Sequence, residues 1–186
     1  HLQKAAFVGL SMGALLALRL AAYAPDRVSR LALLSPAGLA TIKASMLQRI
    51  IAANLPGRDS AITMRDLMTY IFMNPDVPIS HDTTHVIEFL ELIARYQKTM
   101  INPRAAFEGL LTGLPVNRRA LARCDMPSTV IVGADDVMFD AIQVVRSAAH
   151  HLPNFVGAKI IPDSGHAMIY QQAEQVNAAL VDFLHH

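Results

Sequence analysis

Cysteine is nearly missing from this sequence, and its scarcity excludes a fold held together by disulfides. Among 186 residues there is one cysteine, Cys124, and no tryptophan. A single cysteine excludes an intrachain disulfide and fits a reducing compartment, so we expect a cytoplasmic location. No spacing of His, Cys, Asp and Glu resembles a set of metal ligands, so no metal site is predicted.

An excess of charge of one sign is also missing, as is any long apolar run. The 16 lysines and arginines nearly balance the 15 aspartates and glutamates, giving a net charge of +1. The charges are scattered, which argues against nucleic acid or a charged membrane surface as a partner. The most apolar helical stretch, residues 12–24, contains Arg19 and is too short to span a bilayer. Apolar residues make up 53% of the chain, enough for the core of one domain.

Two parts of the chain alternate between apolar strands and helices. The predicted strands span residues 4–10, 28–35, 128–133 and 158–161. The predicted helices span residues 12–24, 117–122, 141–152 and 174–184, the third with a stripe of Ile142, Val145, Ala149 and Leu152. Strands without polar alternation are typical of a parallel sheet covered on both faces. The fold class is therefore α/β, with a mostly parallel sheet flanked by helices.

The segment between these parts, residues 39–115, contains no convincing buried strand. It is rich in methionine, and apolar residues recur at helical spacing over residues 86–100. We expect a helical cap inserted into a core that consists of residues 1–38 and 116–186. Its methionine and aromatic side chains belong either to an ordinary helical core or to an adaptable apolar pocket.

The stretch Gly9-Leu10-Ser11-Met12-Gly13 lies between a predicted strand and a predicted helix. This context favours a sharp turn with strained backbone angles that holds the serine hydroxyl clear of the chain. We expect side chains at positions 9 and 13 to collide in such a turn, which explains both glycines. The helix that begins here also offers free backbone N–H groups.

A serine hydroxyl becomes a good nucleophile only when a base removes its proton and an acid orients that base. Candidates for both follow later strands. Gly133-Ala134-Asp135-Asp136 ends one strand, and Ser164-Gly165-His166 follows the last strand. Ligands of open parallel sheets bind at the carboxyl ends of the strands, where these residues are expected.

These three motifs, in the order serine, aspartate and histidine, resemble the α/β-hydrolase superfamily, specifically a serine carboxylesterase-like member with a helical cap. The resemblance implies that Ser11 is the nucleophile and His166 the base. It implies that Asp136, three residues after Gly133, is the acid in preference to Asp135. It also implies that the Met12 N–H contributes to an oxyanion hole, and that no cofactor is needed.

The resemblance predicts a serine hydrolase that cleaves carboxylic esters of small molecules through an acyl-enzyme. Thioesterase, lactonase, C–C bond hydrolase and acyltransferase chemistry stay open, because one fold supports them all. A non-catalytic protein that binds a hydrophobic ligand is the alternative from another class. A chain that is inert by itself is a third possibility.

The superfamily places further strands, and the loop with a second oxyanion donor, before the serine strand. Neither is found in this sequence, so the sheet is expected to have an open edge along Ala5–Val8. We expect an N-terminal segment or a second chain to complete the sheet there.

Overall fold

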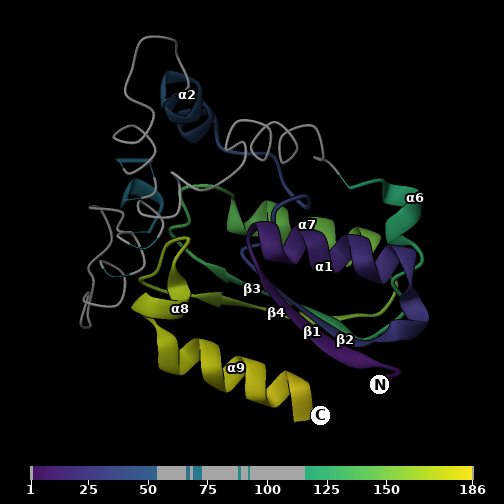
Figure 1. Ribbon diagram of the computed structural model, residues 1–186. Coiled ribbons are helices and arrows are strands. Elements are labelled where there is room, and N and C mark those ends of the chain that lie inside the picture. The colour runs from purple at the N-terminus through teal and green to yellow at the C-terminus, as the bar shows by residue number, and fades with distance from the viewer. Residues whose placement is uncertain are drawn as a thin grey trace.

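Four parallel strands form the sheet at the centre of the computed structural model (Figure 1). The structure describes residues 2–53, 66–67, 69–72, 88, 92 and 116–185. The strands are β1 (Ala5–Leu10), β2 (Val28–Leu34), β3 (Ser128–Gly133) and β4 (Phe155–Ile161), in the order β1-β2-β3-β4. Leu10 pairs with Leu34, and Gly133 pairs with Ile161, so the carboxyl ends of the strands lie together along one side of the sheet, across the strands. The predicted α/β class with a parallel sheet is confirmed.

Helices cover both faces of this sheet. They are α1 (Met12–Tyr23), η1 (Pro25–Arg27), α2 (Ala44–Ala53), α6 (Arg118–Leu121), α7 (Ala141–His151), α8 (Met168–Gln171) and α9 (Ala173–His185). Figure 1 shows α1 and α7 on one face of the sheet and α8 and α9 on the other. Asp140 is the residue before helix α7, and its carboxylate caps the helix by accepting a hydrogen bond from the Gln143 N–H at 2.8 Å.

The two faces of the sheet are buried in separate apolar clusters. The larger cluster joins α1 and α7 to the sheet through residues such as Leu18, Leu33 and Val144, all fully buried. The smaller cluster joins β2 to α8 and α9 through residues such as Ala32, Met168 and Val176. Covering both faces explains why the strand sequences are continuously apolar.

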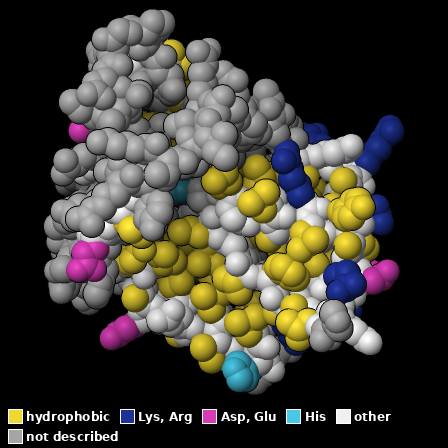
Figure 2. Space-filling view, viewed as in Figure 1, with side chains coloured by type: hydrophobic (Ala, Val, Ile, Leu, Met, Phe, Trp, Pro, Cys, Tyr) yellow, Lys and Arg dark blue, Asp and Glu magenta, His cyan; other side chains and the backbone are white. Residues whose placement is uncertain are grey.

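The outer strands β1 and β4 are the exceptions, because they form the two edges of the described sheet and are less well covered. In β4, Val156 is 57% exposed. The same holds for β1 and the helix that follows it. Val8 is 47% exposed, and Leu16 of the neighbouring helix α1 is 57% exposed. Figure 2 shows hydrophobic side chains gathered across the face that β1, α1 and α9 present. The apolar sequence of residues 12–24 predicts a deeply buried helix. In the structure half of α1 is buried, but Met12 and Leu16 are 49% and 57% exposed.

Most of the predicted cap, residues 39–115, lies outside the described residues, including all of the helix predicted over residues 86–100 except Glu88 and Leu92. Its described residues after Lys43 are helical wherever they occur. Helix α2 inserts Met46 and Ile50 into the larger cluster, where Leu67 and Ile71 are also buried. In the part of the chain that the structure describes, no helix has the length and apolar character needed to cross a membrane.

Candidate active site

The turn between β1 and α1 holds Ser11 in a strained backbone conformation, with φ of 53° and ψ of −112°. Non-glycine residues with positive φ are uncommon and cluster at functional sites. The turn is secured by the Ser11 N–H, which donates to the Leu34 carbonyl at 2.8 Å. It also requires glycine at position 9, since a Cβ on Gly9 would lie 2.5 Å from the Gly13 carbonyl oxygen.

The expectation that a side chain at Gly13 would collide as well is wrong. A Cβ built on Gly13 meets nothing within 4 Å. The two glycines are therefore not equivalent, because only Gly9 lies under the first turn of α1.

Met12 is the first residue of α1, directly after the serine. The first N–H groups of a helix have no partner within the helix, and the positive end of the helix dipole lies there. The Met12 N–H is thus one of the first N–H groups of α1 and belongs to the residue next to Ser11.

Asp136 and His166 form a buried pair at the same edge of the sheet. His166 Nδ1 lies 2.9 Å from Asp136 Oδ2 and 3.1 Å from Oδ1. Asp136 is 1% exposed and His166 is 2% exposed. Asp136 Oδ1 also accepts hydrogen bonds from the backbone N–H groups of Met138, at 2.7 Å, and Phe139, at 3.2 Å. Asp135, the other sequence candidate, is exposed.

Opposing influences act on the pKa of Asp136, and their net effect lowers it below 3.8. Burial by itself raises this pKa, because it disfavours the charged form. The charge and hydrogen bond of His166 outweigh burial, with help from the Met138 N–H and the Ser35 hydroxyl. Asp136 is therefore an ionised carboxylate at neutral pH, as an acid that orients an imidazole must be.

Close backbone packing brings the aspartate and histidine loops together. The Asp135 N–H donates to the Ser164 carbonyl at 2.9 Å. A Cβ on Gly133 would lie 2.2 Å from the Gly165 carbonyl oxygen, so glycine is required there. Spacing in the sequence predicts the two loops at one edge of the sheet, but not this contact.

Sequence reasoning missed two buried polar residues at the site. The Gln171 side chain accepts a hydrogen bond from the Gly165 N–H at 2.7 Å and so fixes the loop before His166. Ser35, just beyond β2, is fully buried with φ of 38°. Its Oγ forms no hydrogen bond of standard geometry among the described residues, yet it lies close enough to Asp136 to help lower that pKa. A polar residue directly after a buried strand was the available signal for Ser35.

Ser11 lies at the same edge of the sheet as the pair, since it follows β1 as Asp136 follows β3 and His166 follows β4. Among the hydrogen bonds of the described residues, none joins the Ser11 hydroxyl to His166. In unliganded enzymes catalytic hydrogen bonds are often long and tighten when substrate binds. The arrangement thus provides a held imidazole and a presented hydroxyl at one edge.

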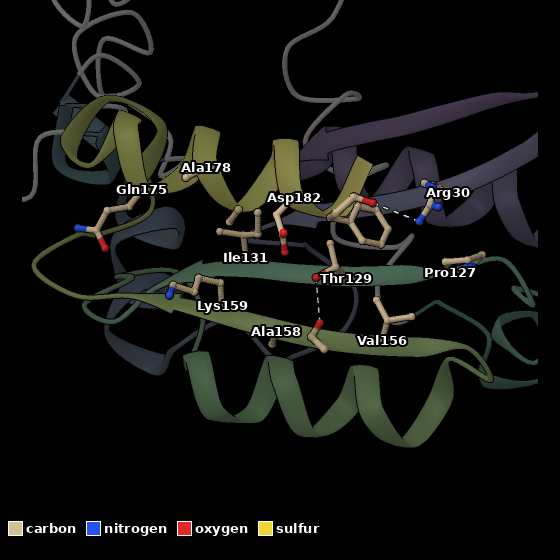
Figure 3. Close-up of a pocket in the computed structure, with 13 residues that line it drawn as sticks. Arg30, Pro127, Thr129, Ile131, Val156, Ala158, Lys159, Gln175, Ala178 and Asp182 are labelled. Atoms are coloured by element: carbon tan, nitrogen blue, oxygen red, sulfur yellow. Dashed lines mark hydrogen bonds between the residues drawn. The ribbon is translucent and has the colours of Figure 1, made fainter. Parts of the chain in front are cut away.

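Three other features of the described residues were candidates for a site, namely a groove, the cysteine and clusters of metal-binding residue types. A groove of about 750 Å³ lies between α9 and strands β3 and β4. Figure 3 shows the side chains that line it. Two polar side chains of the groove already donate hydrogen bonds within the protein, Thr129 to the Gly157 carbonyl at 2.9 Å and Arg30 to the Phe183 carbonyl at 3.1 Å.

Burial raises the pKa of the Cys124 thiol to about 11, so this cysteine lacks the thiolate form that a nucleophile needs. Among the described residues no cluster of His, Cys, Asp and Glu is suited to a metal ion.

The chain is similar to a known protein family in sequence and to solved structures in fold. The model of a family described as the alpha/beta hydrolase family matches residues 1–179. No curated protein matches the sequence significantly. Naproxen esterase (carboxylesterase NP) from Bacillus subtilis is similar in structure, with 19% identity and a TM-score of 0.74 over 98% of this chain and 60% of that one. Carboxylesterase CesB from Bacillus subtilis shares 19% identity, with a TM-score of 0.72 over 98% and 60% of the two chains.

A further similar structure is the 2-hydroxy-6-oxo-6-phenylhexa-2,4-dienoate hydrolase from a Rhodococcus strain. It shares 18% identity, with a TM-score of 0.67 over 100% of this chain and 65% of that one. This chain therefore spans less than two thirds of each of these structures. At such identities the structural likeness concerns the fold, whereas the family model covers nearly the whole sequence. The chain belongs to the alpha/beta hydrolase family.

Proposed function

We propose that this protein is a serine hydrolase that cleaves carboxylic esters through an acyl-enzyme. The observation that carries the proposal is the buried contact of 2.9 Å between His166 and Asp136, at the sheet edge where a strained turn presents Ser11. A held imidazole and a presented hydroxyl are the two parts that nucleophilic acyl transfer needs.

In the proposed reaction the Ser11 Oγ attacks the ester carbonyl carbon while His166 Nε2 removes the hydroxyl proton. Asp136 holds the Nδ1–H tautomer and stabilises the imidazolium. The Met12 N–H donates to the oxyanion of the tetrahedral intermediate. The intermediate collapses, and His166 returns the proton to the leaving alcohol. Water then attacks the acyl-enzyme by the same route and releases the carboxylic acid and Ser11.

We further propose that residues 39–115 form a cap over an apolar acyl pocket. Phe72 of this segment lies edge-on to the His166 ring, with ring centroids 6.5 Å apart and an interplanar angle of 76°. The Phe139 ring lies 5.8 Å from His166. Aromatic rings beside the base exclude water from it and offer an apolar wall to an acyl chain.

We also propose that a further segment, from the N-terminal side or from a second chain, completes the sheet beside β1. Val8, Met12 and Leu16 are 47%, 49% and 57% exposed along this edge. An unpaired edge strand with apolar neighbours favours association, so proteins usually cover such an edge. The same segment would supply the second oxyanion donor.

Hydrolysis of a series of p-nitrophenyl esters, from acetate to long acyl chains, tests the activity and the pocket together. We expect turnover by the complete protein, with KM falling as the chain lengthens, because each buried CH₂ contributes about 0.8 kcal/mol. Ser11→Ala should lower kcat by about 10⁴-fold or more. Turnover of thioesters, lactones or C–C bonded substrates in preference to esters would replace the proposed substrate class. Binding of hydrophobic ligands without any turnover would instead identify a binding protein.

A further inference from the structure

The residue before helix α2, Lys43, contacts the turn that carries Asp136. Its Nζ donates to the Asp136 backbone carbonyl at 2.6 Å, and its own N–H donates to the Met138 carbonyl at 2.9 Å. The preceding residue, Ile42, forms an isolated antiparallel bridge with Phe139. Two adjacent residues of the β2–α2 connection thus hold the whole turn 136–139.

The two sides of this turn have different partners. Its N–H groups at Met138 and Phe139 point to the Asp136 carboxylate, at 2.7 and 3.2 Å. Its carbonyl groups at Asp136 and Met138 accept hydrogen bonds from Lys43. A hydrogen bond from an ammonium group is charge-assisted and about twice as strong as a neutral one. Lys43 therefore fixes the backbone from which the Asp136 side chain extends toward His166.

Lys43 also lies where the inserted segment leaves the core. It directly precedes Ala44, the first residue of α2, and the helix is anchored by Met46 and Ile50, which are 0% and 3% exposed. A contact from this point to the aspartate turn joins the base of the segment to the site.

We propose that Lys43 is a positioning residue that ties the Asp136 turn to the base of the inserted segment, and so holds Asp136 in register with His166. This inference rests on the proposed roles of Asp136 and His166, and it assigns Lys43 no contact with substrate.

Kinetics of Lys43 variants test this role. Lys43→Met removes the donors and keeps the length of the side chain. We expect kcat to fall by about 10- to 100-fold, as for a displacement of roughly 1 Å in a catalytic group, while KM stays within about twofold. Lys43→Arg should restore most of kcat. The matched control is Lys159→Met, which removes an exposed lysine of β4 outside this turn and should leave kcat and KM unchanged.

A spectroscopic readout separates positioning from a general loss of stability. The proton on His166 Nδ1, which is hydrogen-bonded to the Asp136 carboxylate, should give a downfield resonance in the proton NMR spectrum. We expect this resonance to shift or broaden in Lys43→Met, to return in Lys43→Arg and to be unchanged in Lys159→Met. If Lys43→Met does not fold, Lys43→Gln, which keeps a neutral donor, takes its place in both measurements.

The outcomes separate this inference from the proposed function. If the wild type hydrolyses esters and the Lys43 variants match it in kcat and in the His166 resonance, Lys43 is not a positioning residue, although the proposed function stands. A change in KM alone would also overturn the inference. If the wild type shows no Ser11-dependent hydrolysis, the proposed function fails, and the resonance alone decides whether Lys43 positions the pair.

Discussion

At the scale of single residues, Asp136 and its neighbour Asp135 differ in burial and in hydrogen bonding. The Asp136 carboxylate accepts hydrogen bonds from His166, Met138 and Phe139, whereas the side chain of the adjacent Asp135 is exposed. An isolated buried carboxylate would be strongly destabilised, but donors from several directions compensate for the lost water. Two neighbouring residues of the same type thus have opposite environments, and their variants make a matched pair.

Asp136→Asn should lower kcat by about 10⁴-fold, because the amide no longer holds His166 in the required tautomer. Asp135→Asn serves as the control and should change kcat by less than about tenfold, since its side chain is exposed and its hydrogen bond to the histidine loop comes from the backbone N–H, which the substitution keeps. Steady-state kinetics on one ester distinguish the two variants. The reverse ranking would show that the acid has been assigned to the wrong aspartate.

Stability should depend on pH through Asp136. Its pKa is lowered in the folded protein relative to 3.8, so its ionised form stabilises the fold above the unfolded pKa, and this contribution is lost as the pH falls through the folded pKa. The difference in free energy of unfolding between wild type and Asp136→Asn should therefore shrink as the pH is lowered from about 5. Urea denaturation at a series of pH values measures it. A difference that grows toward low pH would mean that the pKa of Asp136 is raised rather than lowered.

At the scale of elements, β2 and α1 each carry a leucine, and the two leucines differ strongly in burial. Leu33 in β2 is fully buried between layers, whereas Leu16 in α1 is 57% exposed beside the β1 edge. Both side chains are leucine, so the contrast in burial alone sets their contributions to the stability of the chain as described.

Leu33→Ala should lower the free energy of unfolding by about 2–5 kcal/mol, because it removes buried methyl groups and leaves a cavity. Leu16→Ala should change it by no more than about 0.5 kcal/mol. Urea denaturation of the two variants of the 186-residue chain gives both values. Equal losses at the two positions would mean that the β1 edge is already covered in solution, for example by a second copy of the chain.

Sequence patterns identified the elements better than the faces they bury. The strands were predictable because apolar runs of their length suit a parallel sheet, and β3 begins and ends where predicted. The apolar stripe predicted for α7 marks its buried side only in part. Leu152 is buried and Val145 packs against the core, but Ile142 is 50% exposed, while Ala141, Val144 and Ala148 are buried. Small residues meet the sheet closely there, and a search for large apolar residues overlooks them.

The candidate site was predictable to the extent that chemistry constrains residue type. A nucleophile, a base and an acid require particular residue types, which here occur in short motifs in a recognisable order. Ser11, His166 and Asp136 could therefore be picked out from the sequence. Lys43 and Gln171 form hydrogen bonds with backbone atoms, Lys43 with Asp136 far along the chain and Gln171 with Gly165 in the preceding loop. Almost any polar residue can make such contacts, so no local pattern indicates them.

For the molecule as a whole, the open β1 edge is the feature with the largest consequence. We expect the 186-residue chain alone to associate or to lack full activity until a further segment pairs with β1. Light scattering coupled to size-exclusion chromatography, followed by ester hydrolysis on the same fractions, tests this expectation. A monomeric, cooperatively folded and fully active chain of this length would show that no completing segment is needed.

The central claim, that Ser11 is an activated nucleophile, is tested most directly by labelling with a fluorophosphonate. The reagent phosphonylates a serine only when a base activates its hydroxyl. For the complete protein we predict one adduct by intact mass, located on the Ser11 peptide, with no adduct in Ser11→Ala and normal labelling in Asp135→Asn. Labelling that persists in Ser11→Ala, or a folded and complete wild-type protein that takes up no label, would contradict the account.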